Sequence, residues 1–324
     1  MAPPAGRRLR RGLARALAAV LIVCGVAAVL TAQARHGVRG MVLRVDAARN
    51  TLILSHDAIP GVMPAMTMPF EVRDARELRG VVPGAIVAFT LALDGDRAYA
   101  GGVRVIPYES VERDPVTARR LRLLRDITLP QEAALAVGQA VPDFTLLDQT
   151  RARVWLSQFR GTVVALNFVY TSCVLPQFCY RLANHFNVVR RRFDARMGRD
   201  LVLLTVTFDP ARDTPERLAE YARQWNADPG VWRFLTGDAA GIAEVGRRFG
   251  LDAFPDEGLI SHSTRTVVIN RAGRLAASIE GNHYTAAQLG DLIETVVQGA
   301  DARLPGSAPG SRAAKVEPRR STLD

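Results

Sequence analysis

The chain has 324 residues, 48% of them hydrophobic, which is enough to bury the cores of two domains. Its formal charge is +10, yet Lys315 is its only lysine and its arginines are scattered along the whole sequence. Because no run of basic residues alternates with aromatic residues, the composition argues against a nucleic-acid partner.

Residues 1–34 have the form of an export signal. Arginines within residues 7–15 precede an apolar stretch at 16–32, and Thr31-Ala32-Gln33-Ala34 has the small-x-small form of a cleavage site. The apolar stretch is at the short limit for crossing a bilayer, so we expect either a cleaved signal or an anchor in the inner membrane. Positive charge before it places the rest of the chain on the periplasmic side. That exported part carries two cysteines, as suits a compartment in which disulfides form.

Residues 35–108 are expected to form a small all-β domain. Runs rich in β-branched residues alternate with Asp, Gly and Pro turns, at residues 40–45, 51–55, 66–72, 86–93 and 98–106. Five short strands in so short a segment predict an OB-like five-stranded barrel.

Three of the six methionines of the chain fall within six residues of this domain. Met66 and Met68 are two apart on a predicted strand, so both point to one face while Thr67 points to the other. His56 ends the preceding strand and is expected to reach that face across the turn. Thioethers and an imidazole make a soft site suited to Cu(I), although methionines also fill barrel cores.

The stretch around the Met-Thr-Met motif resembles the CusF-type periplasmic copper-binding domain, a small five-stranded barrel. The resemblance covers residues 38–108 and implies His56, Met66 and Met68 as metal ligands. In that family a tryptophan usually caps the ion shortly before the motif. This chain has Met63 there, which offers an extra sulfur ligand in place of a cation–π contact.

Beyond this domain the pattern changes twice. Residues 109–137 are charged and helix-compatible between Pro115 and Pro130, and we interpret them as a linker that contains a helix. From residue 138 to 299 strand-like and helix-like segments alternate, which predicts an α/β domain with a sheet covered by helices. Residues 300–324 are rich in Pro, Gly, Ser and Arg and are predicted to be disordered.

The two exported cysteines lie where a predicted strand leads into a predicted helix. An apolar run at residues 163–170 predicts a buried strand, and residues 180–193 predict a helix. Pro176 is tolerated in a first helical turn but not inside a helix, so the helix is expected to begin near it. Cys173 then lies in the loop and Cys179 in the first turn, where free N–H groups and the helix dipole favour a thiolate.

A strand, a loop with two cysteines and a helix, in a βαβ setting that ends in a hairpin and a helix, predict the thioredoxin arrangement. In that fold the segment at residues 261–265, before the predicted strand at 266–269, packs beside the cysteines. It carries His262 and no proline, where thioredoxins have a cis-proline. His262 is therefore expected to lie near both thiols.

Two acidic residues near a predicted helix have a structural interpretation. The helix that runs to residue 225 has Pro215 in its first turn, Asp213 or Thr214 as its cap and Glu216 as an acidic partner, so Asp213 and Glu216 are interpreted as capping residues. Asp209 has no such local role.

The cysteine pair, the Asp209-Pro210 and Arg212-Asp213-Thr214-Pro215 motif, and His262 in His-Ser-Thr occur in the order found in the Sco/SenC family, which residues 138–299 resemble. The resemblance implies a membrane-tethered, thioredoxin-fold copper protein that serves assembly of the copper centre of cytochrome c oxidase. It implies the two cysteines and His262 as copper ligands and Asp209 as a neighbouring acidic residue. The family's cysteines usually enclose three residues, whereas five intervene here.

Functions from different classes fit these residues. Cys173, Cys179 and His262 can hold Cu(I) or Cu(II) when the thiols are reduced, and the Met-Thr-Met domain then collects Cu(I) and passes it to them. In that case the partner is a cytochrome c oxidase subunit or another copper-accepting protein, and the task is oxidase assembly or copper tolerance. Alternatively, the chain is a thiol–disulfide oxidoreductase, which has no need of the Met-Thr-Met domain. A third alternative is an inert disulfide, which would close a short loop and stabilise the fold only modestly.

Overall fold

The structure is a computed structural model that describes residues 35–94, 97–107, 134–173, 176–251, 253–256 and 259–299. The predicted export segment, residues 109–133 of the predicted linker with its helix, and the predicted disordered tail lie outside the described residues. Among the described residues, no helix has the length and apolar character needed to span a membrane.

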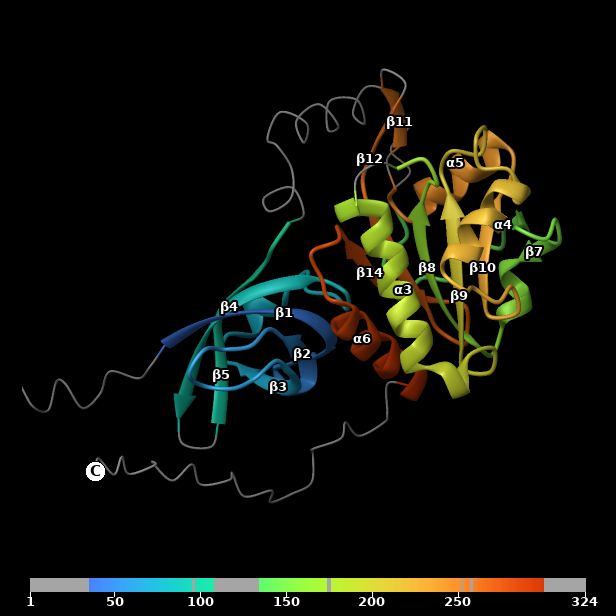
Figure 1. Cartoon of the computed structure of the whole chain (residues 1–324). Coiled ribbons are helices and arrows are strands. Elements are labelled where there is room, and N and C mark those ends of the chain that lie inside the picture. The colour runs from blue at the N-terminus through green and yellow to red at the C-terminus, as the bar shows by residue number, and fades with distance from the viewer. Residues whose placement is uncertain are drawn as a thin grey trace, which may run out of the picture.

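The N-terminal part is a barrel whose five strands pair in the closed order β1-β2-β3-β5-β4 (Figure 1). The strands are β1 (Arg35–Asp46), β2 (Thr51–His56), β3 (Met66–Val72), β4 (Ile86–Asp94) and β5 (Arg97–Val105). Alternate side chains point inward, so that Leu52, Leu54 and Phe70 are fully buried. The predicted all-β domain and its five strands are confirmed.

The C-terminal part is built on a seven-stranded sheet in the order β14-β13-β8-β9-β10-β6-β7. Its strands are β6 (Thr145–Asp148), β7 (Arg153–Trp155), β8 (Val163–Val169), β9 (Leu201–Thr207), β10 (Trp232–Thr236), β13 (Arg265–Ile269) and β14 (Leu275–Glu280). β8, β9 and β10 run parallel, and β13 pairs antiparallel with β8. Every residue of β8 and β9 is buried, as expected for central strands covered on both faces.

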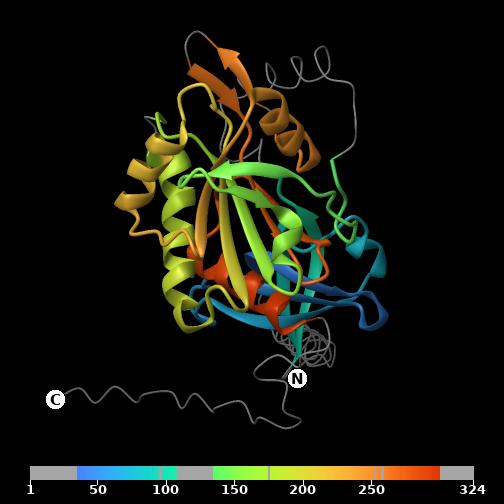
Figure 2. The ribbon, with the colours of Figure 1, turned by 90° about the vertical axis from the view of Figure 1, so that its right-hand side faces the viewer.

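Helices cover both faces of this sheet (Figure 2). They are α3 (Arg181–Arg192), α4 (Pro215–Gln224), α5 (Ala239–Arg248) and α6 (Ala286–Gln298). Asn167 of β8 donates to the carbonyl of Leu182 in α3, whereas its neighbour Phe168 packs against Phe249 at the end of α5. Successive residues of a strand face opposite sides, so α3 and α5 cover opposite faces. This arrangement confirms the predicted α/β thioredoxin-like domain.

Several strands were not predicted from the sequence. These are β10 and the edge pair of β6 and β7, and His262 was expected in a segment that leads into β13. Instead, β11 (Ala253–Asp256) and β12 (Leu259–His262) form a separate antiparallel hairpin, and His262 is the last residue of β12. The hairpin was missed because only a few residues separate β12 from the strong signal of β13.

The barrel packs against the α/β part of the chain. Met41, Leu43 and Ile53 point outward from the barrel and join the hydrophobic core of the C-terminal part. In Figure 1 α6 lies between the barrel and α3. Gly84, which has a positive φ of 92°, approaches β14 so closely that an added Cβ would lie 2.7 Å from the carbonyl oxygen of Ser278.

Candidate metal centres

The candidate ligands of the barrel are brought together by the pairing of two adjacent strands. β2 and β3 are antiparallel, and their register sets His56 opposite Met66 and Leu54 opposite Met68. The predicted reach of His56 across the turn is confirmed, because directly opposed residues of two strands share a face. The loop between the strands is closed by a bridge in which the N–H of Ile59 donates to the carbonyl of Met63 over 2.9 Å.

The imidazole of His56 is held in one orientation. Only 1% of the residue is exposed, its Nδ1 lies 2.7 Å from the carbonyl oxygen of Asp57, and its ring meets the ring of Phe70 edge-on. Its other nitrogen, Nε2, is buried and has no hydrogen-bond partner. A buried polar atom without a partner is costly, and an imidazole that donates from Nδ1 carries a lone pair on Nε2. This nitrogen therefore fits the role of a metal ligand.

The three methionines differ in exposure. Met66 is 46% exposed, whereas Met63 and Met68 are half-buried and pack against the hydrophobic core of the barrel. The soft sulfur atoms thus range from the core to the surface, so a metal ion bound with His56 would remain accessible to a partner.

The two cysteines lie on either side of an unusual first turn of the helix that leads into α3. After β8 and a loop, residues Pro176–Tyr180 form a π-helical turn that continues into α3, which confirms that the helix begins near Pro176. A π turn accommodates more residues than an α turn. Although five residues intervene between Cys173 and Cys179, their thiols hydrogen-bond to one another. Neither cysteine is in a disulfide.

The predicted thiolate character of Cys179 is not what the structure shows. Cys179 is only 2% exposed. The hydrogen bond with the Cys173 thiol, burial and the charge of a Cys173 thiolate raise the pKa of Cys179 well above its ordinary value, although the backbone N–H of Tyr170 acts in the opposite direction. The helical start was expected to favour the anion, but these contacts outweigh it because they act at shorter range.

Tyr170 lies at the centre of this region, and the sequence analysis did not identify its role. Its hydroxyl interacts with Cys173, and burial, together with the nearby cysteine sulfurs, raises its pKa. The carboxylate of Asp209, 6% exposed and paired with Arg212 at 3.0 Å, is close enough to act in the same direction. The one feature of the sequence that could have indicated a role for Tyr170 was its position at the end of the predicted buried strand.

Asp213 holds the loop before the cysteines. Its carboxylate is fully buried and accepts hydrogen bonds from the N–H and hydroxyl of Thr171, at 3.0 and 2.5 Å, and from the hydroxyl of Thr207 at 2.5 Å. Of the two expected caps of α4, the structure selects Thr214, whose side chain accepts from the N–H of Arg217, and not Asp213. Glu216 lies in the first turn of α4, as expected for an acidic partner of the cap.

His262 is surrounded by aromatic rings next to the cysteines. Its ring centroid lies 4.5 Å from that of Phe208, 5.7 Å from that of Tyr170 and 6.5 Å from that of Phe178. Its Nδ1 lies 2.8 Å from the carbonyl oxygen of Ser263, which favours Nε2 as the atom that would bind a metal.

Tyr170 thus contacts His262 and the cysteines, but the three predicted ligands do not yet form one cluster. In the described part of the chain, no three His, Cys, Asp or Glu side chains are arranged so that they could hold a metal ion. The cysteine pair is assembled, and His262 is brought into the same region but not onto both sulfurs.

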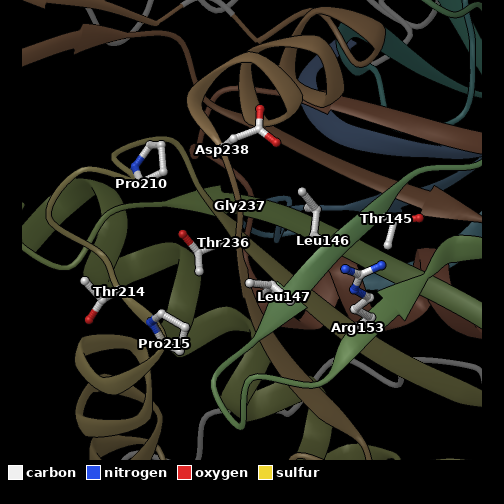
Figure 3. Close-up of a pocket in the computed structure, with 10 residues that line it drawn as sticks. All are labelled: Thr145, Leu146, Leu147, Arg153, Pro210, Thr214, Pro215, Thr236, Gly237 and Asp238. Atoms are coloured by element: carbon white, nitrogen blue, oxygen red, sulfur yellow. The ribbon is translucent and has the colours of Figure 1, made fainter.

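A pocket of about 370 Å³ is lined by other residues of the Sco half of the chain (Figure 3). It is formed between β6 and the beginnings of α4 and α5, where Thr214 and Asp238 cap the helices. None of the predicted metal ligands lines it.

Comparison with known proteins identifies the class of both parts. Residues 133–298, just over half of the chain, match the SCO1/SenC family, and residues 35–99 match the copper binding periplasmic protein CusF. The chain therefore belongs to the SCO1/SenC family and carries a CusF-like copper-binding domain before the Sco domain. Both resemblances inferred from the sequence motifs are confirmed.

Individual relatives cover the Sco part. A putative copper-binding protein of Stutzerimonas stutzeri is 27% identical over 170 residues, which are 50% of this chain and 81% of that protein. The SCO1 protein homolog of Bacillus subtilis (strain 168) is 27% identical over 163 residues, 48% of this chain and 80% of that protein.

Solved structures overlap the same half of the chain. The copper-bound ScoI of Arabidopsis thaliana is 22% identical, covers 49% of this chain and 99% of its own, and superposes with a TM-score of 0.44. A SCO1/SenC family lipoprotein from Bacillus anthracis str. Ames is 18% identical, covers 51% of this chain and 99% of its own, and has a TM-score of 0.45.

Proposed function

We propose that this protein is an exported copper carrier with two sites. His56, Met66 and Met68, with Met63 as an additional sulfur, take up Cu(I) on the barrel. Cys173, Cys179 and His262 hold copper on the Sco domain for delivery. The observation that carries the proposal is the buried, unpartnered Nε2 of His56 opposite Met66, on the same chain as a pair of hydrogen-bonded thiols.

The ligand chemistry suits copper at both sites. Thioethers, thiolates and imidazoles are soft or intermediate ligands that select Cu(I) over hard cations. The thiols must lose their protons to bind, and burial of Cys179 opposes this step until the metal replaces the proton. His262 would then join the sulfurs through a local movement of the loop or of the β11–β12 hairpin.

The organisation that we propose follows the sequence. Residues 1–34 export the chain to the periplasmic side and are either cleaved or kept as an inner-membrane anchor. Residues 35–108 and 138–299 are the two copper-binding domains, 109–137 link them, and 300–324 form a tail. The recipient is a copper-accepting subunit of cytochrome c oxidase, the role that the Sco/SenC resemblance implies, or another copper protein.

A second function is supported by the same thiols. Cys173 is more exposed than Cys179, so its thiolate could attack a disulfide of a partner protein and form a mixed disulfide. Cys179 would then displace the partner, leaving a Cys173–Cys179 disulfide and two reduced partner thiols. The high pKa of Cys179 disfavours it as the first nucleophile.

Copper stoichiometry tests the two-site proposal. The purified reduced protein should bind two Cu(I) ions per chain, and the Met66→Ile/Met68→Ile variant should bind one while keeping the thiolate–copper absorption. A ratio of one or zero in the unaltered protein would remove the two-site proposal.

His262 separates the two functions of the Sco domain. If copper delivery is the function, His262→Ala should weaken copper binding far more than it slows disulfide exchange with a model substrate. The opposite order would favour the oxidoreductase.

A further inference from the structure

The Met-Thr-Met strand contacts the Sco domain through its middle residue. Thr67 lies between Met66 and Met68 and points to the opposite face of β3. It pairs across the strands with Ser55, and both hydroxyls donate to Oδ2 of Asp291 in α6, over 3.1 Å for Thr67 and 2.7 Å for Ser55. One carboxylate oxygen from the other domain therefore ties β2 to β3 directly behind the candidate copper site.

Asp291 is itself fixed by the Sco domain. Its second oxygen, Oδ1, forms an ion pair of 2.8 Å with Arg192, near the end of α3. Because Arg192 occupies Oδ1, Oδ2 is directed at the two barrel hydroxyls. Hydrogen bonds to a charged acceptor are stronger than those between neutral groups, so the carboxylate of Asp291 restrains β2 and β3 of the barrel.

A second residue of α6 holds both neighbours of His56. Gln288 is buried, and its Nε2 donates to the carbonyl of Ser55 over 3.2 Å and to the carboxylate of Asp57 over 3.1 Å. Its Oε1 accepts from the N–H of Thr285 at the start of α6, which fixes the amide. Asp57 is also the residue whose carbonyl orients the His56 ring.

We propose that Asp291 and Gln288 are positioning residues for the copper site of the barrel, so that the Sco domain sets the Cu(I) affinity of the neighbouring domain. The inference depends on the proposed function, since it assumes that His56, Met66 and Met68 bind copper. The residues that α6 holds, Ser55, Asp57 and Thr67, are chain neighbours of these ligands.

The physical reason is the cost of ordering flexible ligands. Methionine side chains have three rotatable bonds, and Met66 is 46% exposed, so holding the strand ends in register lowers the entropy lost when the ligands bind a metal. By linkage, Cu(I) at the barrel should in turn strengthen its docking on α6.

The test uses the full chain with Cys173→Ser and Cys179→Ser, and with Cys24 of the N-terminal segment also changed to serine, so that no thiol remains to compete with the barrel for Cu(I). Cu(I) affinity is measured by competition with a chromophoric chelator. We expect Asp291→Ala to weaken binding about tenfold, which corresponds to about 1.4 kcal/mol. Glu294→Ala is the matched control, because Glu294 lies on the same helix and pairs with Arg196 of the Sco domain. It should change the affinity less than twofold.

A conservative change on the barrel side keeps the result interpretable if Asp291→Ala disturbs folding. Thr67→Val removes one hydroxyl and keeps the branched shape, and it should weaken Cu(I) binding several-fold. Combined with Asp291→Ala it should add little, since both remove the same hydrogen bond.

Two outcomes would overturn the positioning role of Asp291 and Gln288, and a third would overturn the barrel copper site on which that role depends. Unchanged affinity in both single variants would overturn it. An equal loss in Glu294→Ala would show a general effect of α6, which also overturns it. If the parent chain with its cysteines replaced binds no Cu(I), the barrel site of the proposed function fails first.

Discussion

The two candidate copper sites are assembled in different ways. In the barrel, His56 and Met66 are opposite residues of one hairpin, so strand pairing sets both on one face, and α6 holds their chain neighbours. In the Sco domain, Cys173 and Cys179 meet at a helical start, whereas His262 arrives from a hairpin late in the chain. The first set of residues is brought together by neighbouring strands, and the second depends on the whole sheet. In the described part of the chain, the second set does not form a cluster that could hold a metal ion.

The sites also differ in their protons. A thioether has no proton to lose, so only the imidazole can release one when copper binds to the barrel. Thiols must lose their protons to bind a metal, and the pKa of Cys179 is raised. We therefore expect copper binding at the barrel to depend less on pH than copper binding at the cysteine pair.

The largest expected effect is on the pH dependence of Cu(I) affinity. Binding at Cys173, Cys179 and His262 releases up to three protons, two from the thiols and one from the imidazole, so the affinity should rise by up to ~1000-fold for each pH unit. Binding at the barrel releases at most one proton and should change by no more than ~10-fold per unit. Chelator competition at pH 6, 7 and 8 measures both slopes, using Met66→Ile/Met68→Ile for the cysteines and Cys173→Ser/Cys179→Ser for the barrel. Equal slopes would contradict the comparison.

Loss of Asp213 should damage the cysteine site and leave the barrel site intact. Asp213→Ala leaves the buried groups of Thr171 and Thr207 without their acceptor, which should lower the free energy of unfolding by about 3 kcal/mol. Glu216→Ala is the control, since Glu216 is exposed and solvent screens its ion pair with Arg151, so that its loss should change the stability little. Urea denaturation gives both values. A similar loss in the two variants would show that Asp213 has no special role.

His185 should make the Sco domain sensitive to acid. It lies on α3 against Tyr284, and burial, aided by Arg181, lowers its pKa from 6.5 to about 4. The unfolded chain therefore binds a proton that the folded chain rejects, so stability is constant above pH 6.5 and falls as the pH drops toward 4. The total loss is about 3 kcal/mol.

His185→Leu tests this directly. Urea denaturation between pH 7 and pH 4 should show a smaller decline for the variant than for the unaltered protein. The two slopes should be equal above pH 7, where neither state takes up the proton. Parallel curves over the whole range would exclude His185 as the source of acid sensitivity.

The smallest expected effect comes from a glycine beside the barrel site. Gly40 pairs with His56 across β1 and β2, and an added Cβ would lie 2.9 Å from the Cα of His56. Gly40→Ala should therefore displace His56, cost about 1 kcal/mol of stability and weaken Cu(I) binding several-fold at the barrel. Gly37→Ala, on the same strand with no atom within 4 Å of the added Cβ, should leave the affinity unchanged. The cysteine site should be unaffected by either change.

Local rules were enough for the barrel and for the start of the cysteine helix. Alternation along β3 separates Met66 and Met68 from Thr67, and the intolerance of helix interiors for proline marks the start at Pro176. Local rules failed for β10, whose five residues follow a glycine-containing turn and take part in the sheet through pairing with β9. Local rules also failed for Asp213. An aspartate before a Thr-Pro sequence can cap the helix or accept hydrogen bonds from a distant loop, and the sequence does not distinguish the two roles.

The sequence by itself determined the two domain classes and the family, since these follow from local patterns and motifs, and it supplied the two ligand sets that we propose. Only the tertiary structure decided three further properties: the protonated state of Cys179, the position of His262 among aromatic rings, and the contact of Asp291 with Ser55 and Thr67. These depend on burial and on contacts between segments far apart in the chain. Periodicity and spacing describe only neighbours along the chain, so they could not reveal them.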